Sequence, residues 1–214
     1  MKEKIDPIKF MKDYCDFSNP ENVWIMTGMI RNKDNQINQI KFLKRFIIKE
    51  ESDLQYCRNE IHRVAININT YYRLYISLNA RNVVNSFFNF QKRLLDLNIG
   101  LAKGYEDALN LSKKVSSLWK TELEQIRNRG TKRILLDIDD CQDSNIIYGI
   151  VDYIEDNCHT TLHCVHQTVT GYSIVFDACD VRGLLKMCKE ENIKADIQRD
   201  SLVFVEKWKG NLIY

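Results

Sequence analysis

The chain has 214 residues, of which 44% are apolar and 28% are charged, a composition typical of an ordered globular protein of one large or two small domains. No apolar run reaches the roughly 18 residues that span a bilayer, and residues 1–6 lack the apolar stretch of a signal peptide. These features argue against a membrane-spanning or secreted protein, and we expect a cytoplasmic one.

Seven cysteines are present, and none forms a C-x-x-C pair. A disulfide framework requires an oxidising compartment and usually an even number of cysteines. We therefore expect reduced thiols, most of them small buried apolar residues.

The net charge of +2 conceals an uneven distribution along the chain. Residues 1–131 hold 22 Lys and Arg against 15 Asp and Glu, a net charge of +7, whereas residues 132–214 hold 9 against 14, a net charge of −5. This distribution is expected of a protein whose basic part binds a polyanion and whose acidic part binds cations nearby. Ordinary solvent-exposed helix faces give the same pattern.

The N-terminal part, residues 1–131, has a helical and mixed pattern. Residues 23–27 are predicted to form a strand and residues 31–39 a loop or helix start. The aromatic and β-branched segment 71–78 predicts another strand, after which Asn79 can cap a helix over residues 80–97. A second helix is predicted from residue 105 to about residue 127.

The C-terminal part, residues 132–214, changes to short alternating segments. It predicts, in order, a strand at 134–138, a helix at 144–156, strands at 160–168 and 171–177, a helix at 181–191 and a strand at 202–205, with an extra short strand at 193–197. A two-residue turn would join the hairpin strands. This βαββαβ order is ferredoxin-like, so the predicted fold class is α+β with a ferredoxin/RRM-like C-terminal half.

Two aspartates end the first of these strands. Side chains alternate along a strand, so Asp137 and Asp139 project to the same face, about 7 Å apart along it. Two carboxylates in this arrangement can share one or two Mg²⁺ or Mn²⁺ ions, which prefer oxygen ligands and bind phosphates at their open positions. The pair therefore predicts a metal site, the alternative being an acidic strand end without metal.

The segment Leu135-Leu136-Asp137-Ile138-Asp139, followed after a helix by the Gly-containing hairpin of residues 167–175, resembles archaeo-eukaryotic-type primases and primase-polymerases. The strand and helix around residues 74–81 are also similar to part of small viral or mobile-element members. The resemblance implies a nucleotidyltransferase that uses Mg²⁺ or Mn²⁺ with nucleoside triphosphates and nucleic acid, in the host cytoplasm if the protein is viral. Asp137 and Asp139 would be its metal ligands.

The chain departs from that family at Ser173, which stands where the family has a nucleotide-contacting histidine. A serine hydroxyl can donate to a phosphate oxygen but carries no charge. If residues 169 and 170 form a two-residue turn, His166 falls opposite Ser173 on the same sheet face and can supply the imidazole. Ser173 and His166 are thus candidate catalytic residues with the two aspartates.

A third metal ligand has no unique match among Asp177, Asp196 and Glu206, and we favour Glu206 because it lies on the last predicted strand. The predicted phosphate- or nucleic-acid-binding side chains are the basic residues before the aspartates and at the start of the predicted helix, namely Arg81, Arg129, Lys132 and Arg133.

Two alternatives use the same residues. A non-catalytic RRM-like protein would bind nucleic acid or regulate, stacking bases on Tyr172, Phe176 and Phe204. A haloacid-dehalogenase-like phosphatase also ends a strand in D-x-D, but it needs a long α/β chain after the motif. The sequence lacks the G-x-x-x-x-G-K-[ST], G-x-G-x-x-G and G-x-S-x-G motifs of common NTPases, dinucleotide-binding enzymes and α/β-hydrolases.

Overall fold

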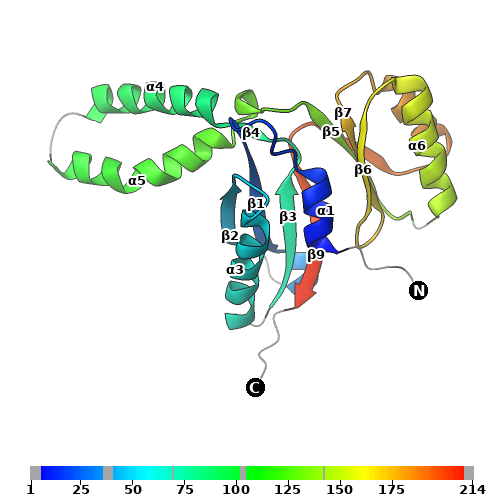
Figure 1. The fold of residues 1–214 in the computed structure, drawn as a ribbon, viewed down its shortest axis with the longest axis horizontal. Coiled ribbons are helices and arrows are strands. Elements are labelled where there is room, and N and C mark those ends of the chain that lie inside the picture. Colours follow the sequence, from blue (N-terminus) through cyan, green and yellow to red (C-terminus); the bar gives the residue numbers. More distant parts are fainter. Residues whose placement is uncertain (1–5, 36–40, 69, 102–104, 142, 210–214) are drawn as a thin grey trace.

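The computed structural model describes residues 6–35, 41–68, 70–101, 105–141 and 143–209. The described chain is a mixed α+β protein with two antiparallel sheets (Figure 1). The seven cysteines are all free thiols. Within the described ranges, no helix is both long enough and apolar enough to cross a membrane.

The first sheet has the strand order β2-β1-β3-β9, with the short β4 paired to β1. Its strands are β1 (Asn22–Ile30), β2 (Lys41–Ile48), β3 (Tyr71–Ser77), β4 (Arg81–Asn82) and β9 (Leu202–Lys209). One face of this sheet is covered by helices, and the other is partly open.

The second sheet has the order β6-β7-β5-β8, and all its pairs are antiparallel. Its strands are β5 (Arg133–Ile138), β6 (Leu162–Gln167), β7 (Tyr172–Asp177) and β8 (Ala195–Gln198). Helix α6 (Ser144–Cys158) connects β5 to β6, and α7 (Arg182–Glu190) connects β7 to β8.

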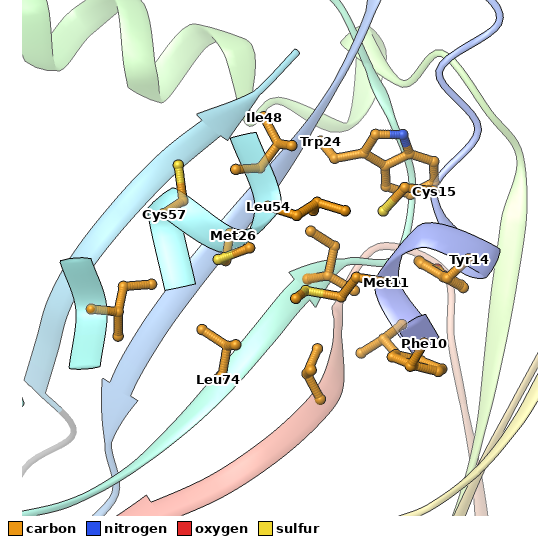
Figure 2. Packing of buried hydrophobic residues seen from close by; sticks show 14 of the residues in the cluster. Phe10, Met11, Tyr14, Cys15, Trp24, Met26, Ile48, Leu54, Cys57 and Leu74 are labelled. Carbon is orange, nitrogen blue, oxygen red and sulfur yellow. The ribbon is translucent and has the colours of Figure 1, made fainter. Parts of the chain in front are cut away.

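Two helices cover one face of the first sheet, α1 (Pro7–Tyr14) and α3 (Asp53–Asn67). Asp6 caps α1 by accepting a hydrogen bond from the Ile8 N–H. Figure 2 shows Met11 from α1 and Leu54 from α3 directed toward Met26 of the sheet. All three side chains are fully buried, so this is the larger hydrophobic core.

The second core lies between the second sheet and its two helices. Ile147 and Ile150 of α6 and Leu184 of α7 pack on Leu136 and Phe176. Side chains alternate along a strand, and Leu135 and Val175 accordingly belong to the first core. One face of the second sheet therefore lies under α6 and α7, and the other faces α1 and the first sheet.

Figure 1 shows α4 (Val83–Leu101) and α5 (Tyr105–Leu123) projecting as a helical pair away from both sheets. The short helix α2 (Asn32–Asn35) follows β1, and a 3-10 turn (Ile126–Asn128) leads toward β5.

Most predicted elements are present within a few residues of their expected ends. The predicted strand at 202–205 exists, but β9 pairs with β3 in the first sheet rather than with the second sheet. The fourth strand of the second sheet is β8, which we had expected only as an extra strand. Helices α1 and α3 and strand β2 were not predicted, and residues 36–39 of the expected loop lie outside the described ranges.

Candidate active site between the two sheets

A row of polar side chains crosses the second sheet on the face turned toward the first sheet. Asp137 of β5 lies opposite Ser173 of β7 on one side and opposite Asp196 of β8 on the other. Ser173 in turn lies opposite His166 of β6, as the two-residue turn predicted. Directly opposed residues share a sheet face, so all four side chains leave the same side.

A cavity of about 210 Å³ opens where this face meets the first sheet. Asp137, Asp139 and Ser173 line it from the second sheet. Tyr75 of β3 and Phe204 of β9 line it from the first sheet. Three of the predicted site residues therefore converge on one cavity.

The two aspartates make one wall of this cavity negative. Burial raises the pKa of Asp137, and the nearby carboxylates of Asp139 and Asp196 raise it further. The hydroxyl of Ser173, which donates to Asp137 Oδ1 at 3.4 Å, and the charge of Arg31 lower the same pKa. Asp137 is thus half-buried among like charges, an environment that a bound cation would relieve.

The opposite wall of the cavity carries two guanidinium groups, from Arg31 after β1 and Arg73 on β3. Arg73 is bound by the Asp34 carboxylate at 2.6 and 3.0 Å. Arg31 donates to the Tyr75 hydroxyl at 3.4 Å and has no carboxylate partner within the described ranges. Sequence reasoning missed both arginines, because only the pairing of distant strands brings them opposite the aspartates.

The β6–β7 turn forms the third side of the cavity through Thr168 and Thr170. The Thr168 hydroxyl accepts a hydrogen bond from the Gly171 N–H at 3.1 Å. A Cβ on Gly171 would lie 1.8 Å from the Ile138 carbonyl oxygen and 3.3 Å from the Asp139 Cα. Only glycine allows the turn to approach the aspartate strand this closely.

His166 lies beside the cavity rather than in its lining. Its ring packs 4.6 Å from the Phe10 ring and 5.8 Å from the Phe204 ring, and the residue is only 6% exposed. Burial lowers its pKa, and the backbone of Val205 offsets this shift in part, although neither ring nitrogen meets the geometry of a hydrogen bond. Its contact with Phe204 makes it a neighbour of the site.

Glu206, the favoured third metal ligand, has a different role in the structure. It points to the α3 side of the first sheet, where Arg58 donates two hydrogen bonds at 2.7 and 2.9 Å and His62 lies at 3.1 Å. Despite burial, these partners lower the pKa of Glu206 to about 2. A carboxylate engaged in this way on the opposite face cannot join Asp137 and Asp139 around one ion, so this expectation is corrected.

The other two acidic candidates occupy opposite ends of the second sheet. Asp177 lies opposite Arg133 and contacts His163 at 2.8 Å. Asp196 lies opposite Asp137 and influences its charge. Of these two, Asp196 is therefore the one that lies beside Asp137.

Two of the four predicted phosphate-binding residues are buried. Arg81 pairs with Asp200 at 2.7 Å and is 5% exposed, in β4 rather than at the helix start. Arg133 is 6% exposed and donates to the Tyr14 carbonyl oxygen at 3.0 Å, with its guanidinium over the Tyr14 and Trp24 rings. Neither guanidinium lines the cavity, because each is committed to holding segments of the fold together.

The remaining two basic residues precede β5. Arg129 donates to the carbonyl oxygens of Ile126 at 3.1 Å and Arg199 at 2.7 Å. Lys132 is exposed, and its backbone carbonyl accepts from the Ala178 N–H. Lys132 is therefore the more accessible of the two.

The donor set of the cavity fits a magnesium-type ion better than a transition metal. Within the described ranges, no group of three or more His, Cys, Asp or Glu side chains is arranged around a metal position. Magnesium is commonly held by one or two carboxylates, with waters and substrate phosphates completing its shell. The pair Asp137 and Asp139, both lining the cavity, suits that mode of binding.

The chain matches no protein-family model, and neither curated proteins nor solved structures show significant similarity to it. The function must therefore be argued from the site itself.

Proposed function

We propose that this protein is a nucleotidyltransferase of the primase-polymerase type, acting on nucleic acid with Mg²⁺ or Mn²⁺ and nucleoside triphosphates. The observation that carries the proposal is the cavity, in which Asp137, Asp139 and Ser173 face Arg31 and Arg73. Carboxylates on one wall and guanidinium groups on the other suit a metal-bound triphosphate.

The topology of residues 133–198 supports this proposal. The order β6-β7-β5-β8, with α6 and α7 on one face, is the arrangement we infer to be ferredoxin/RRM-like. In that arrangement the strand ending in Asp137 and Asp139 and the Gly171 turn are adjacent. These are the two segments that resemble the primase motifs.

Each residue has a role that its contacts support. Asp137 and Asp139 would hold the divalent ion, which would lower the pKa of the attacking hydroxyl and offset charge on the leaving pyrophosphate. Ser173 holds Asp137 in place through its hydroxyl. Arg31 binds phosphate oxygens from the opposite wall, beside Arg73, whose guanidinium is held by Asp34. His166 fixes Phe204 at the edge of the cavity.

The two alternatives gain less support. Phe176 is fully buried in the second core and cannot stack on a base, which weakens the proposal of a non-catalytic RRM-like module. The neighbours of β5 are both antiparallel, whereas the phosphatase resemblance implies an α/β chain.

Metal-dependent incorporation of labelled nucleotides on primed and unprimed single-stranded templates tests the proposal. We expect incorporation by the wild type and a loss of at least about 100-fold in the double variant Asp137→Asn/Asp139→Asn. The matched control is Asp152→Asn/Asp156→Asn, which changes two exposed carboxylates on α6. Equal incorporation by the site variant, or none by the wild type with either metal, contradicts the proposal.

A further inference from the structure

The open face of the first sheet carries a second cavity that adjoins the first. Thr27 of β1, Phe42 and Arg45 of β2 and Arg81 of β4 contribute to its lining. Leu202 lines both cavities, so the two are neighbours on this face.

Two buried polar groups in this second cavity lack partners. Thr27 is 1% exposed, and its hydroxyl makes no hydrogen bond within the described part of the chain. Arg81 is 5% exposed and uses both terminal nitrogens, which donate to Asp200, while its Nε–H has no acceptor. Buried polar groups are normally satisfied, so a ligand in this cavity would find an acceptor to supply to Arg81 Nε–H and a hydrogen bond to make with the Thr27 hydroxyl.

The lining defines the chemistry of that ligand. Two cations, Arg45 and Arg81, are matched by the carboxylates of Glu124 and Asp200, so the cavity is nearly neutral. Phe42 is 60% exposed, and the Arg45 guanidinium lies 4.8 Å from its ring centre. The guanidinium covers one face of the Phe42 ring, and the exposed ring offers the rest of its surface for stacking an unpaired base, which is neutral, planar and able to hydrogen-bond.

The strand register connects this stacking surface to the candidate active site. Thr27 lies opposite Arg45 and Tyr75, and Tyr75 lies opposite Phe204, so the four side chains form one row across the sheet. Arg45 and Thr27 line the second cavity, whereas Tyr75 and Phe204 line the first. At roughly 4.8 Å per strand the row covers about 14 Å. A short stretch of single strand can therefore occupy both cavities.

We propose that the second cavity holds an unpaired base of a single-stranded nucleic acid, whose adjoining nucleotides pass over Tyr75 and Phe204 toward Asp137 and Asp139. The direction of the strand rests on the proposed function, but binding of the base does not.

Fluorescence anisotropy with a labelled oligothymidylate of about 12 nucleotides, in EDTA and without nucleoside triphosphates, measures this binding. Phe42→Ala should weaken the affinity at least about 10-fold. Thr27→Val should also weaken it, while the Tm of the free protein stays equal or rises, because the change removes an unpaired hydroxyl.

The matched controls lie on the other face of the same sheet. Tyr56→Ala removes an aromatic ring of similar exposure, 64%, from α3, and Lys44→Ala changes the β2 neighbour of Arg45 that binds Glu60 instead. Both controls should bind the oligonucleotide like the wild type.

The outcomes separate this inference from the proposed function. The inference is overturned if Phe42→Ala binds the oligonucleotide as tightly as the wild type does, or if the wild type does not bind it. It is also overturned if the wild type binds the same oligonucleotide equally tightly when it is paired with its complementary strand. Each of these results counts even if nucleotide incorporation is observed. If Phe42→Ala and Thr27→Val both weaken binding but the wild type incorporates no nucleotide, the inference is supported and only the proposed function is contradicted.

Discussion

Ser173 lies directly opposite Asp137 on adjacent strands, and its hydroxyl donates to Asp137 Oδ1 at 3.4 Å. Ser173 is 3% exposed, so the hydroxyl has little freedom to turn toward solvent. Ser173 therefore contacts the proposed metal ligand Asp137 rather than open solvent.

Ser173→Ala should lower nucleotide incorporation about 10-fold, which is about 1.4 kcal/mol of barrier, and should lower stability by no more than about 1.5 kcal/mol, because the lost hydrogen bond goes to a charged group. Steady-state kinetics with a thermal unfolding curve checks both expectations. Ser144→Ala, a change at an exposed serine that begins α6, is the control. Full activity in Ser173→Ala would remove Ser173 from the site.

Gly171→Ala should destabilise the protein by about 2 kcal/mol or more and disturb the metal pair. The added Cβ would overlap the Ile138 carbonyl oxygen. Neither atom can rotate aside, because the oxygen belongs to the backbone and the Cβ is bonded directly to it, so the turn must move away from Asp139. Urea unfolding measures the loss. Gly149→Ala on α6 is the matched control, since its Cβ meets no atom within 4 Å and should stabilise the helix by about 0.5–1 kcal/mol. A Gly171→Ala variant as stable as the wild type would contradict the close packing of the β6–β7 turn against the end of β5.

Local sequence patterns were sufficient for one wall of the site. Strand alternation placed Asp137 and Asp139 together, and the two-residue turn placed His166 opposite Ser173. These are contacts within a strand or across one hairpin, where periodicity fixes the register. The other wall could not be predicted, because Arg31 and Arg73 reach it through the pairing of β1, β3 and β9. No local signal reveals that β9 crosses to the first sheet, and this crossing also explains the error for Glu206.

Arg31→Ala should weaken the binding of a magnesium nucleoside triphosphate about 10-fold, because Arg31 faces the aspartates and has no carboxylate partner in the described chain. Isothermal titration calorimetry measures the affinity. Arg63→Ala on α3 is the control, since Arg63 is highly exposed on the opposite face. Unchanged affinity in Arg31→Ala would assign triphosphate binding elsewhere.

Arg133→Met should destabilise the protein by about 3 kcal/mol, because it removes the hydrogen bond to the Tyr14 carbonyl oxygen and the contacts with the Tyr14 and Trp24 rings. The neighbouring Lys132→Met changes an exposed side chain and should alter stability by less than about 0.5 kcal/mol. Chemical unfolding of both variants decides between a structural and a phosphate-binding role for Arg133. A stable Arg133→Met protein with lost phosphate affinity would restore the role expected from the sequence.

Glu206 makes stability depend on pH in the acidic range. Its partners Arg58 and His62 hold the pKa of Glu206 at about 2 in the folded protein, below the ordinary value of 4.5. A depressed carboxyl pKa stabilises the fold fully above the unfolded value, and the contribution falls as pH drops from about 4.5 to about 2. It is on the order of 3 kcal/mol at neutral pH.

Glu206→Gln should therefore be less stable than the wild type at neutral pH, and the difference should shrink as pH falls through this window. Urea unfolding at a series of pH values measures the difference directly. Glu155→Gln, at an exposed position on α6, should show no such convergence. A constant difference between wild type and Glu206→Gln would mean that Arg58 and His62 stabilise the strand by packing rather than by charge.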